Sequence, residues 1–169
     1  IQKPAVSQTV CTALQMGLVD LLASWSVRPA GVVGHSSGEM AAAYAAGRIT
    51  AAEAITIAYY RGYMVSFNQK KGAMLAVGLG ADQGAEYIRQ AGKEGRVKVA
   101  AINSPASITM SGDADAIEQL SVQLTQEAIF NRQLRTGGLA YHSHHMLSFG
   151  HDYAQAVDDG LQRLASLGI

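Results

Sequence analysis

This sequence has little cysteine, no excess of charge of either sign and no long apolar run. The single cysteine, Cys11, has no partner for an internal disulfide, and no Cys/His group has the spacing of a structural zinc site. The 13 basic residues balance the 13 acidic ones, and no basic stripe argues for nucleic acid as a partner. No run approaches the roughly 20 apolar residues of a membrane span. These absences predict a soluble, cytoplasmic protein without nucleic-acid or membrane partners.

The sequence has the composition of a folded globular protein. Of its 169 residues, 49% are hydrophobic and 15% are charged, which is enough for a sizeable core in one domain or in a larger and a smaller subdomain. The chain begins with Ile1 and ends just after a helical pattern. We therefore expect both ends to be cuts within a longer protein.

The pattern in the first third of the chain predicts a helix, a strand, a turn and further helices. Apolar residues recur every three or four positions, which predicts an amphipathic or buried helix ending near Pro29. A short apolar run at residues 31–34 predicts a strand, and the alanine-rich stretch after Ser36 predicts a helix closed by Gly47. The apolar positions of the first helix are Val6, Val10, Leu14, Leu18, Leu21, Leu22 and Trp25.

A second region of shorter elements begins near Gly72. Thr50 and Glu53 have capping-box spacing and predict a helix that reaches about Phe67. After this helix the pattern changes from long helices to short alternating elements. Beyond Gly72 the pattern predicts the order βαββαβ, which is that of a ferredoxin-like subdomain. The predicted elements are strand 74–79, helix 81–91, strand 97–102, strand 107–111, helix 114–128 and strand 130–134.

The pentapeptide from Gly34 to Gly38 has the pattern G-x-S-x-G, with Ser36 at its centre. Between a strand and a helix, this pattern is typical of a nucleophile elbow, a strained turn that exposes a serine hydroxyl. The following amides point at the same space from a helix N-terminus, so the N–H of Ser37 is a candidate oxyanion donor. A plain turn between strand and helix is the alternative interpretation.

A serine nucleophile needs a histidine base that the fold brings near it. His35 adjoins Ser36 at a turn where side chains diverge, which favours a packing or hydrogen-bonding role. The tract at residues 142–145 is the better source of a base. It lacks carboxylate or cysteine partners at ligand spacing, so we predict no metal site. Three histidines are expected to lie on the surface: His144, His145 and His151.

Four ordered motifs make the sequence resemble the acyltransferase domains of polyketide synthases and related malonyl-CoA:acyl-carrier-protein transacylases. The resemblance runs through nearly all 169 residues. Two of its segments, VGHSSGE and AYHSHHM, are most similar to fungal iterative, reducing-type synthases. The motifs are Gly34 to Glu39, Arg61, Asn103-Ser104-Pro105 with Ser111-Gly112-Asp113, and Tyr141 to Met146.

The resemblance implies a ping-pong acyl transfer. Ser36 would be the nucleophile, His142 its general base, and Arg61 the clamp for the free carboxylate of a malonyl group, although a lone helical arginine is usually a surface group. A guanidinium can hold a carboxylate in a bidentate pair and so orient the thioester. The implied substrate pocket contains His35, Leu139, Tyr141 and Asn103.

The resemblance also implies partners and a substrate. Malonyl-CoA would donate the acyl group, and the phosphopantetheine thiol of an acyl carrier protein would accept it, beside the ketosynthase and other domains of a parent synthase. No bound cofactor is required. Tyr141 stands where malonyl-type domains have phenylalanine, which favours malonyl over methylmalonyl, whereas Leu139 matches neither type.

The implied fold is α/β, with an incomplete α/β-hydrolase-like larger subdomain and the ferredoxin-like subdomain inserted in it. The predicted boundaries are 1–71 for the part with the elbow, 72–136 for the insert, and 137–169 for the return that carries the histidine. A complete domain of this kind also supplies a Gly-Gln-Gly-type loop upstream and further strands downstream, so we expect the chain alone to be poorly active.

Two alternatives remain open at this point. A serine hydrolase or thioesterase would use the same elbow, with Asp113 or Asp115 as the acid, but both residues adjoin a helix start, where aspartate more often caps. The second alternative is a catalytically incomplete segment of a synthase.

Overall fold

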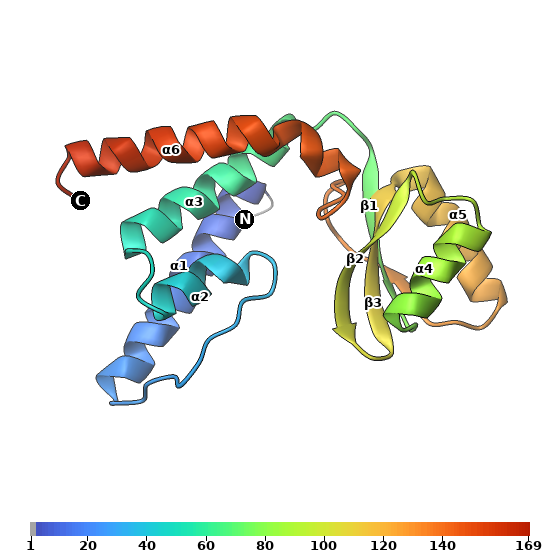
Figure 1. Cartoon of the computed structure of the whole chain (residues 1–169), viewed down its shortest axis with the longest axis horizontal. Helices are drawn as coiled ribbons and strands as arrows, with labels where there is room; N and C mark the ends of the chain where they lie inside the picture. Colours follow the sequence, from blue (N-terminus) through green and yellow to red (C-terminus); the bar gives the residue numbers. More distant parts are fainter. Residues whose placement is uncertain (1–2) are drawn as a thin grey trace. The chain divides into compact units, whose positions relative to one another are not determined.

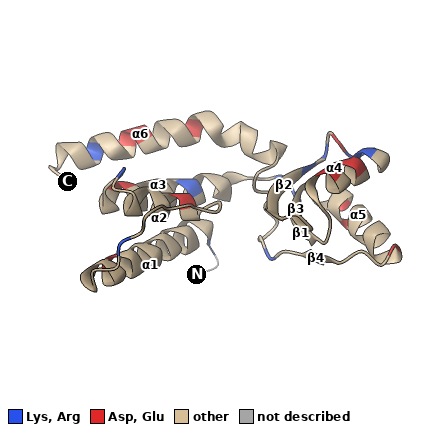
Figure 2. Ribbon diagram, turned by 60° about the horizontal axis from the view of Figure 1, so that its bottom comes forward, with Lys and Arg blue, Asp and Glu red and all other residues tan. Residues whose placement is uncertain are grey.

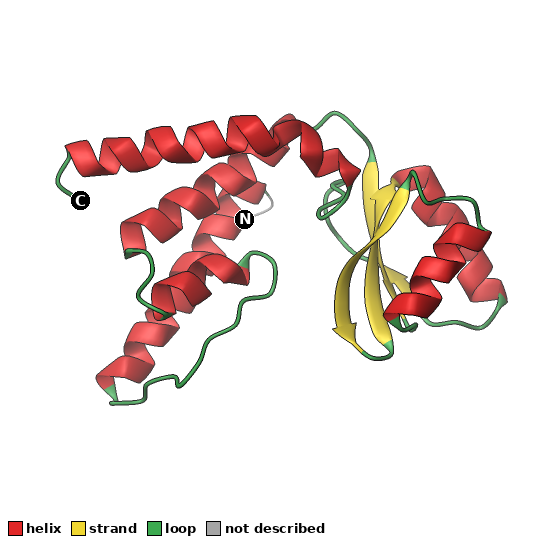
Figure 3. Ribbon diagram, in the orientation of Figure 1, coloured by secondary structure: helices red, strands yellow, loops and turns green. Residues whose placement is uncertain are grey.

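The computed structural model describes residues 3–169, which form two compact units that we describe one at a time. Unit 1 consists of the chain up to Phe67 together with Phe149–Ile169, and unit 2 consists of Asn68–Ser148. The units differ from the predicted boundaries because residues 137–148, which include His142, belong with the small sheet. All strands that the structure describes lie in unit 2 (Figure 3).

Unit 1 is helical. Helix α3 packs against both α1 and α6, and α2 packs against α1 (Figure 1). A short 3₁₀ turn, η1 (Val65–Phe67), extends α3. The helices are α1 (Pro4–Ser24), α2 (Gly38–Ala45), α3 (Ala51–Met64) and α6 (Gly150–Ser166).

Local signals in the sequence place the end of α2 and the start of α3 correctly, whereas α1 ends at Ser24 and not near Pro29 as predicted. The hydroxyl of Thr50 accepts a hydrogen bond from the N–H of Glu53, and the Glu53 carboxylate accepts one from the N–H of Thr50. This is the predicted capping box at the start of α3. After α2, Gly47 has a φ of +66°, the left-handed conformation of a glycine that ends a helix.

The strand predicted at residues 31–34 is wrong. These residues have no regular structure, and Val33 is 94% exposed. A strand must exchange hydrogen bonds with a neighbour, because its own backbone N–H and C=O groups cannot pair with each other. The described part of unit 1 contains only helices, so this apolar run has no strand beside it.

The apolar stripe of α1 is exposed, contrary to its predicted role in a core. Its seven residues are between 44% and 65% exposed, whereas the buried positions of the helix are Gln8, Thr12 and Met16. The buried cluster of unit 1 is correspondingly small and contains Met16, Ala41 and Ala54.

Helix α1 is also long and apolar enough, by length and composition, to cross a membrane. The expectation that no such run exists is therefore wrong for Pro4–Ser24. This is weak evidence for a membrane span, because the core helix of a globular protein passes the same test.

Unit 2 has the predicted element order βαββαβ. The elements begin and end within about two residues of their predicted positions, as is usual for boundaries inferred from periodicity. They are β1 (Gly72–Val77), α4 (Ala81–Gln90), β2 (Val97–Ser104), β3 (Ser107–Asp113), α5 (Ala114–Gln126) and β4 (Asn131–Gln133), followed by the 3₁₀ helix η2 (His144–Phe149).

The sheet of unit 2 is antiparallel, with the strand order β2-β3-β1-β4. Both α4 and α5 cover the same face (Figure 1). Helix α5 buries an apolar stripe that includes Ile117, Leu120 and Leu124, and β1 and β3 meet it with alternating residues such as Leu75 and Ile108. Unit 2 therefore encloses its own hydrophobic core.

Acidic and basic residues are interspersed over both units (Figure 2). The helices of each unit carry both signs, in keeping with the formal net charge of zero.

Candidate active site

Ser36 lies in a tight, strained turn. Its φ is +53°, a left-handed conformation that costs an ordinary residue about 1–2 kcal/mol. The turn is closed by the N–H of Gly38, which donates to the carbonyl of His35 (3.0 Å), and by the N–H of Glu39, which donates to the carbonyl of Ser36 (3.2 Å). Backbone strain of this kind is concentrated at functional sites. The observed geometry is that of the predicted elbow, without the preceding strand.

Gly34 is the glycine that the turn requires. A Cβ atom there would lie 2.5 Å from both the Cα and the N of Glu39, which are backbone atoms in the first turn of α2. At Gly38 a Cβ atom would meet nothing within 4 Å. Of the two glycines that flank Ser36 in the motif, Gly34 alone is required by a close backbone approach.

Arg61 lies beside Ser36. Its Nη2 donates a hydrogen bond to Oγ of Ser36 (3.3 Å), and its Nη1 donates to Oε1 of Gln8 (2.6 Å). The three residues come from α3, the turn before α2, and α1. Gln8 is 9% exposed and Arg61 is partly buried. The fold thus brings a positive charge to the serine hydroxyl, where a substrate carboxylate could bind.

Two neighbours of Arg61 were missed in the sequence. Gln8 shares one face of α1 with Thr12 and Met16, so a polar residue on that row was the available signal. For Tyr153 on α6, no pattern in the sequence gave such a signal. Burial raises the pKa of Tyr153, and the charge of Arg61 partly offsets that rise. Tyr153 therefore lies within electrostatic reach of the guanidinium.

Ser37 is the N-cap residue of α2 and has a helical φ of −64°. Its side chain forms no cap hydrogen bond. The backbone N–H of Ser37 is thus at the positive end of a helix, in the residue next to Ser36. Its role as an oxyanion donor stays a prediction.

His142 lies in the loop between β4 and η2. It is exposed and has a φ of +58°, so both residues predicted to carry the chemistry adopt the left-handed conformation. Ser36 belongs to unit 1 and His142 to unit 2, and the structure brings Ser36 together with Arg61 in unit 1.

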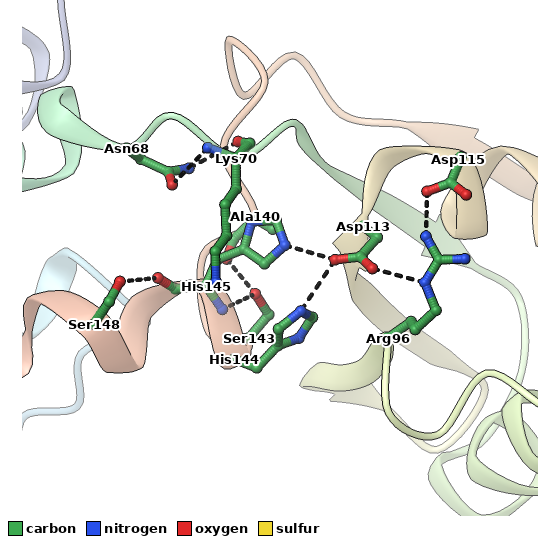
Figure 4. A network of polar contacts seen from close by, with 10 residues as sticks. All are labelled: Asn68, Lys70, Arg96, Asp113, Asp115, Ala140, Ser143, His144, His145 and Ser148. Carbon is green, nitrogen blue, oxygen red and sulfur yellow. Dashed lines mark hydrogen bonds and ion pairs between the residues drawn. The ribbon is translucent and has the colours of Figure 1, made fainter.

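His144 and His145, which we call the histidine pair, were expected on the surface, and the structure contradicts this. His145 is 1% exposed and the side chain of His144 is 29% exposed. Nε2 of His145 lies 2.7 Å from Oδ1 of Asp113, and Nε2 of His144 lies 3.0 Å from the same oxygen (Figure 4). The third histidine with this prediction, His151, is exposed. The carboxylate partner was missed because it stands 31 residues before His144.

Asp113 is the N-cap residue of α5, at the expected helix start, but its side chain forms no cap hydrogen bond. Its Oδ2 instead accepts a hydrogen bond from Nε of Arg96 (2.7 Å), and Arg96 also pairs with Asp115 (Figure 4). Burial by itself raises the pKa of the Asp113 carboxyl. Hydrogen bonds from the histidine pair and Arg96 outweigh burial and lower this pKa from 3.8 to about 2.

Asp113 and the histidine pair could in principle hold a metal ion, since one ligand atom from each lies within 4.8 Å of the others. A metal would have to replace both imidazole contacts to the carboxylate. The guanidinium of Arg96 beside that carboxylate would also oppose a second cation. The absence of a metal site therefore stays a prediction.

The remaining predicted pocket residues are spread over both units. His35 is exposed in unit 1, and Asn103 is exposed on β2, where its Nδ2 donates to Oγ1 of Thr109 (3.1 Å). Leu139 is buried and Tyr141 is partly buried in the loop before η2. Their shared role in a pocket stays a prediction.

Comparison with known proteins decides the family. The sequence profile of the acyl transferase domain matches residues 2–168. The chain belongs to this acyl transferase family. The highly reducing polyketide synthase xilA of Penicillium rubens is 72% identical over 169 residues, which are 100% of this chain and 7% of that protein. Prosolanapyrone synthase of Alternaria solani is 58% identical over 168 residues, 99% of this chain and 6% of that synthase.

Solved acyltransferase structures have the same fold. The acyltransferase domain from module 8 of the salinomycin polyketide synthase is 27% identical, with a TM-score of 0.86, over 92% of this chain and 36% of that one. The acyltransferase domain of SpnD, in complex with 2-(pent-4-yn-1-yl)malonyl, is 28% identical, with a TM-score of 0.80, over 89% of this chain and 35% of that one.

These similarities confirm the resemblance to polyketide synthase acyltransferases, including fungal highly reducing synthases. They favour acyl transfer over the alternative interpretation as a serine hydrolase or thioesterase. The acyltransferase chain spans about 7% of the length of its first curated relatives, so the remaining functions of those proteins are outside it.

Proposed function

We propose that this acyltransferase moves a malonyl group from coenzyme A, through an ester on Ser36, to the phosphopantetheine thiol of an acyl carrier protein. The observation that carries the proposal is the contact of Arg61 with the hydroxyl of Ser36. A cation next to the nucleophile selects an acyl group that has a second, free carboxylate. The complex of a malonyl derivative with the SpnD acyltransferase domain supports this class of substrate.

The first half-reaction forms the acyl-enzyme. His142 takes the proton of the Ser36 hydroxyl as Oγ attacks the thioester carbonyl, and the N–H of Ser37 donates to the developing oxyanion. The C–S bond then breaks, and the departing thiolate receives the proton from the imidazolium. The products are malonyl-Ser36 and free coenzyme A.

The second half-reaction repeats these steps with a different thiol. His142 takes the proton of the carrier's phosphopantetheine thiol, the sulfur attacks the serine ester, and Ser36 recovers its proton as the C–O bond breaks. Arg61 holds the malonyl carboxylate throughout, while Gln8 holds Arg61. No metal or redox cofactor takes part in this scheme.

The finer structural assignments belong to the same proposal. Unit 2 has the element order and antiparallel sheet of a ferredoxin-like subdomain, inserted in a larger subdomain of α/β-hydrolase type to which unit 1 contributes helices. Tyr141, in the loop with His142, favours a malonyl over a methylmalonyl extender, and Leu139 of the same loop matches neither type. The partners would be a carrier protein, the ketosynthase and the other domains of a cytoplasmic synthase.

Labelled malonyl-CoA tests the proposal on the intact acyltransferase domain of the parent synthase. Mass spectrometry should locate the label on Ser36. The label should disappear in Ser36→Ala and persist in Ser37→Ala, which is the matched control because Ser37 contributes its backbone rather than its hydroxyl. A domain that takes no label at any residue would exclude the proposed function.

A further inference from the structure

The loop that carries His142 is fastened to unit 2 at both ends. Before it, the N–H of Gly72 donates to the carbonyl of Gly138 (2.8 Å). After it, Oδ1 of Asp113 accepts hydrogen bonds from both imidazoles of the histidine pair. Gly72 and Asp113 are direct partners in the register of β1 and β3. Both attachments of the loop are therefore on one pair of opposed sheet residues.

A cross-brace spans His142 inside the loop. Oγ of Ser143 donates to the carbonyl of Ala140 (2.7 Å) and accepts from the N–H of His145 (3.2 Å). Ser143 and His145 are both buried. The residues on either side of His142 are thereby tied to each other as well as to the sheet.

The loop also packs directly on the backbone of β1. A Cβ atom at Gly72 would lie 2.5 Å from Cβ of Ala140, 2.8 Å from its N, and 3.1 Å from Nδ1 of His145. Only glycine allows the segment with His142 to approach the strand this closely. The position of the loop is set by packing as well as by its hydrogen bonds.

His142 needs such support, because its φ of +58° is unfavourable for a residue with a side chain. A strained conformation persists where the surroundings determine it from several sides. The attachments at Gly72 and Asp113 and the cross-brace through Ser143 together provide that constraint.

We propose that Asp113 is a positioning residue for acyl transfer, and that its carboxylate holds the histidine pair and so keeps His142 in the backbone conformation in which it serves as base. The inference rests on the proposed role of His142. Arg96 orients the carboxylate by binding Oδ2, which leaves Oδ1 to the histidine pair. Asp113 acts through the loop and contacts no reacting atom in this scheme.

Asp115 provides a matched control. It binds the same guanidinium of Arg96 as Asp113 does, and its side chain is 61% exposed. Removing its charge perturbs the electrostatics around Arg96 while the bonds from Asp113 to the histidine pair remain. A difference between the two variants thus isolates the hold on the loop.

The test compares Asp113→Asn with Asp115→Asn in the intact acyltransferase domain. Single-turnover acylation of Ser36 by malonyl-CoA gives a limiting rate and a half-saturating concentration. We expect Asp113→Asn to lower the limiting rate about tenfold or more, since misplacement of a catalytic group by about 1 Å can cost a hundredfold. The half-saturating concentration should change less than about twofold, because Arg61 and Gln8 belong to unit 1.

Hydrogen exchange of the peptide 137–146 measures the same hold without any catalysis. Asp113→Asn should accelerate exchange in this peptide, and Asp115→Asn should not. If the wild-type domain takes no label, the proposed function fails while the exchange data still judge the attachment of the loop. Wild-type acylation by Asp113→Asn, or unchanged exchange in the loop, would overturn the inference.

Conservative replacement separates positioning from general loss of fold. His145→Gln retains an N–H near the position of Nε2, whereas His145→Leu removes it at similar size. We expect the glutamine variant to recover most of the limiting rate and the leucine variant to resemble Asp113→Asn. Equal loss in both, with the thermal midpoint lowered equally, would show that His145 only supports the fold and would count against the inference.

Discussion

The two units bury their apolar residues to very different extents. The core of unit 2 has 11 buried residues drawn from three strands and two helices. The corresponding cluster of unit 1 has three, while the apolar stripe of α1 and the run at residues 31–34 face outward. Exposed apolar surface of this kind is typical of a face that other protein covers. Unit 2 thus encloses a core with its own strands and helices, whereas the described part of unit 1 leaves most of its large apolar side chains exposed.

The polar part of unit 1 is nevertheless well organised. Hydrogen bonds from Arg61 join Gln8 and Ser36 across three segments of the unit. Ser36, the predicted nucleophile, thus belongs to the unit with the smaller buried core, and the loop of His142 belongs to the unit with the larger one. Three predictions test this contrast.

The largest expected effect comes from the same substitution in each unit. Leu120→Ala in unit 2 removes a fully buried side chain and should destabilise the chain by about 2–5 kcal/mol. Leu14→Ala in unit 1, where the leucine is 64% exposed, should stay within about 0.5 kcal/mol. Denaturant unfolding of the chain, followed by circular dichroism, measures both. Equal losses would break the contrast between the units.

A second prediction concerns the polar site of unit 1. Arg61→Ala in the intact domain should slow malonyl transfer about 10- to 100-fold, because a charged hydrogen bond to the substrate carboxylate contributes about 1.5–3 kcal/mol. Transfer from acetyl-CoA should be little changed, since the acetyl group lacks that carboxylate. Rates for both donors in the same preparation measure the effect. If both transfers slow equally, Arg61 has a structural role instead.

The smallest expected effect is on the pH dependence of unit 2. The pKa of Asp113 is about 2 in the fold against 3.8 for the free side chain. A lowered pKa stabilises the fold above the unfolded value and loses this contribution as the pH falls through the folded one. The contribution is about 2–3 kcal/mol at most, because one pKa unit corresponds to about 1.4 kcal/mol.

Chemical denaturation at several pH values between 5 and 2 measures this contribution. Asp113→Asn should flatten the decline in stability over that window, while Asp115→Asn serves as the control on the same Arg96. A variant Asp113→Asn with the wild-type pH profile would show that the attachment of the loop adds nothing to the stability of unit 2.

Local patterns predicted unit 2 better than unit 1. The element order of unit 2 follows from alternation in strands and from the stripe of α5, because each apolar face finds its partner within the same 81 residues. In unit 1, the stripe of α1 and residues 31–34 are also apolar and were predicted to form a helix and a strand, yet their large apolar side chains are exposed. Periodicity shows which face of an element is apolar, and it does not show what covers that face.

The candidate site was predicted in the same uneven way. The motifs led to Ser36, Arg61 and His142, and the contact between Ser36 and Arg61 agrees with them. Gln8 and the partnership of Asp113 with the histidine pair were missed, because these contacts join residues 31 to 53 positions apart. Side-chain contacts over such separations depend on how the elements pack.

Local sequence was enough to predict the turn at Ser36, the capping box at Thr50 and the order of elements in unit 2. Each depends on residues within a few positions, whose steric and hydrogen-bonding preferences act locally. Only the tertiary structure decided that the face of α1 with Gln8 turns inward, that Arg61 reaches Ser36, and that Asp113 holds the loop of His142. Burial and long-range hydrogen bonds depend on which distant elements become neighbours, and no local pattern contains that information.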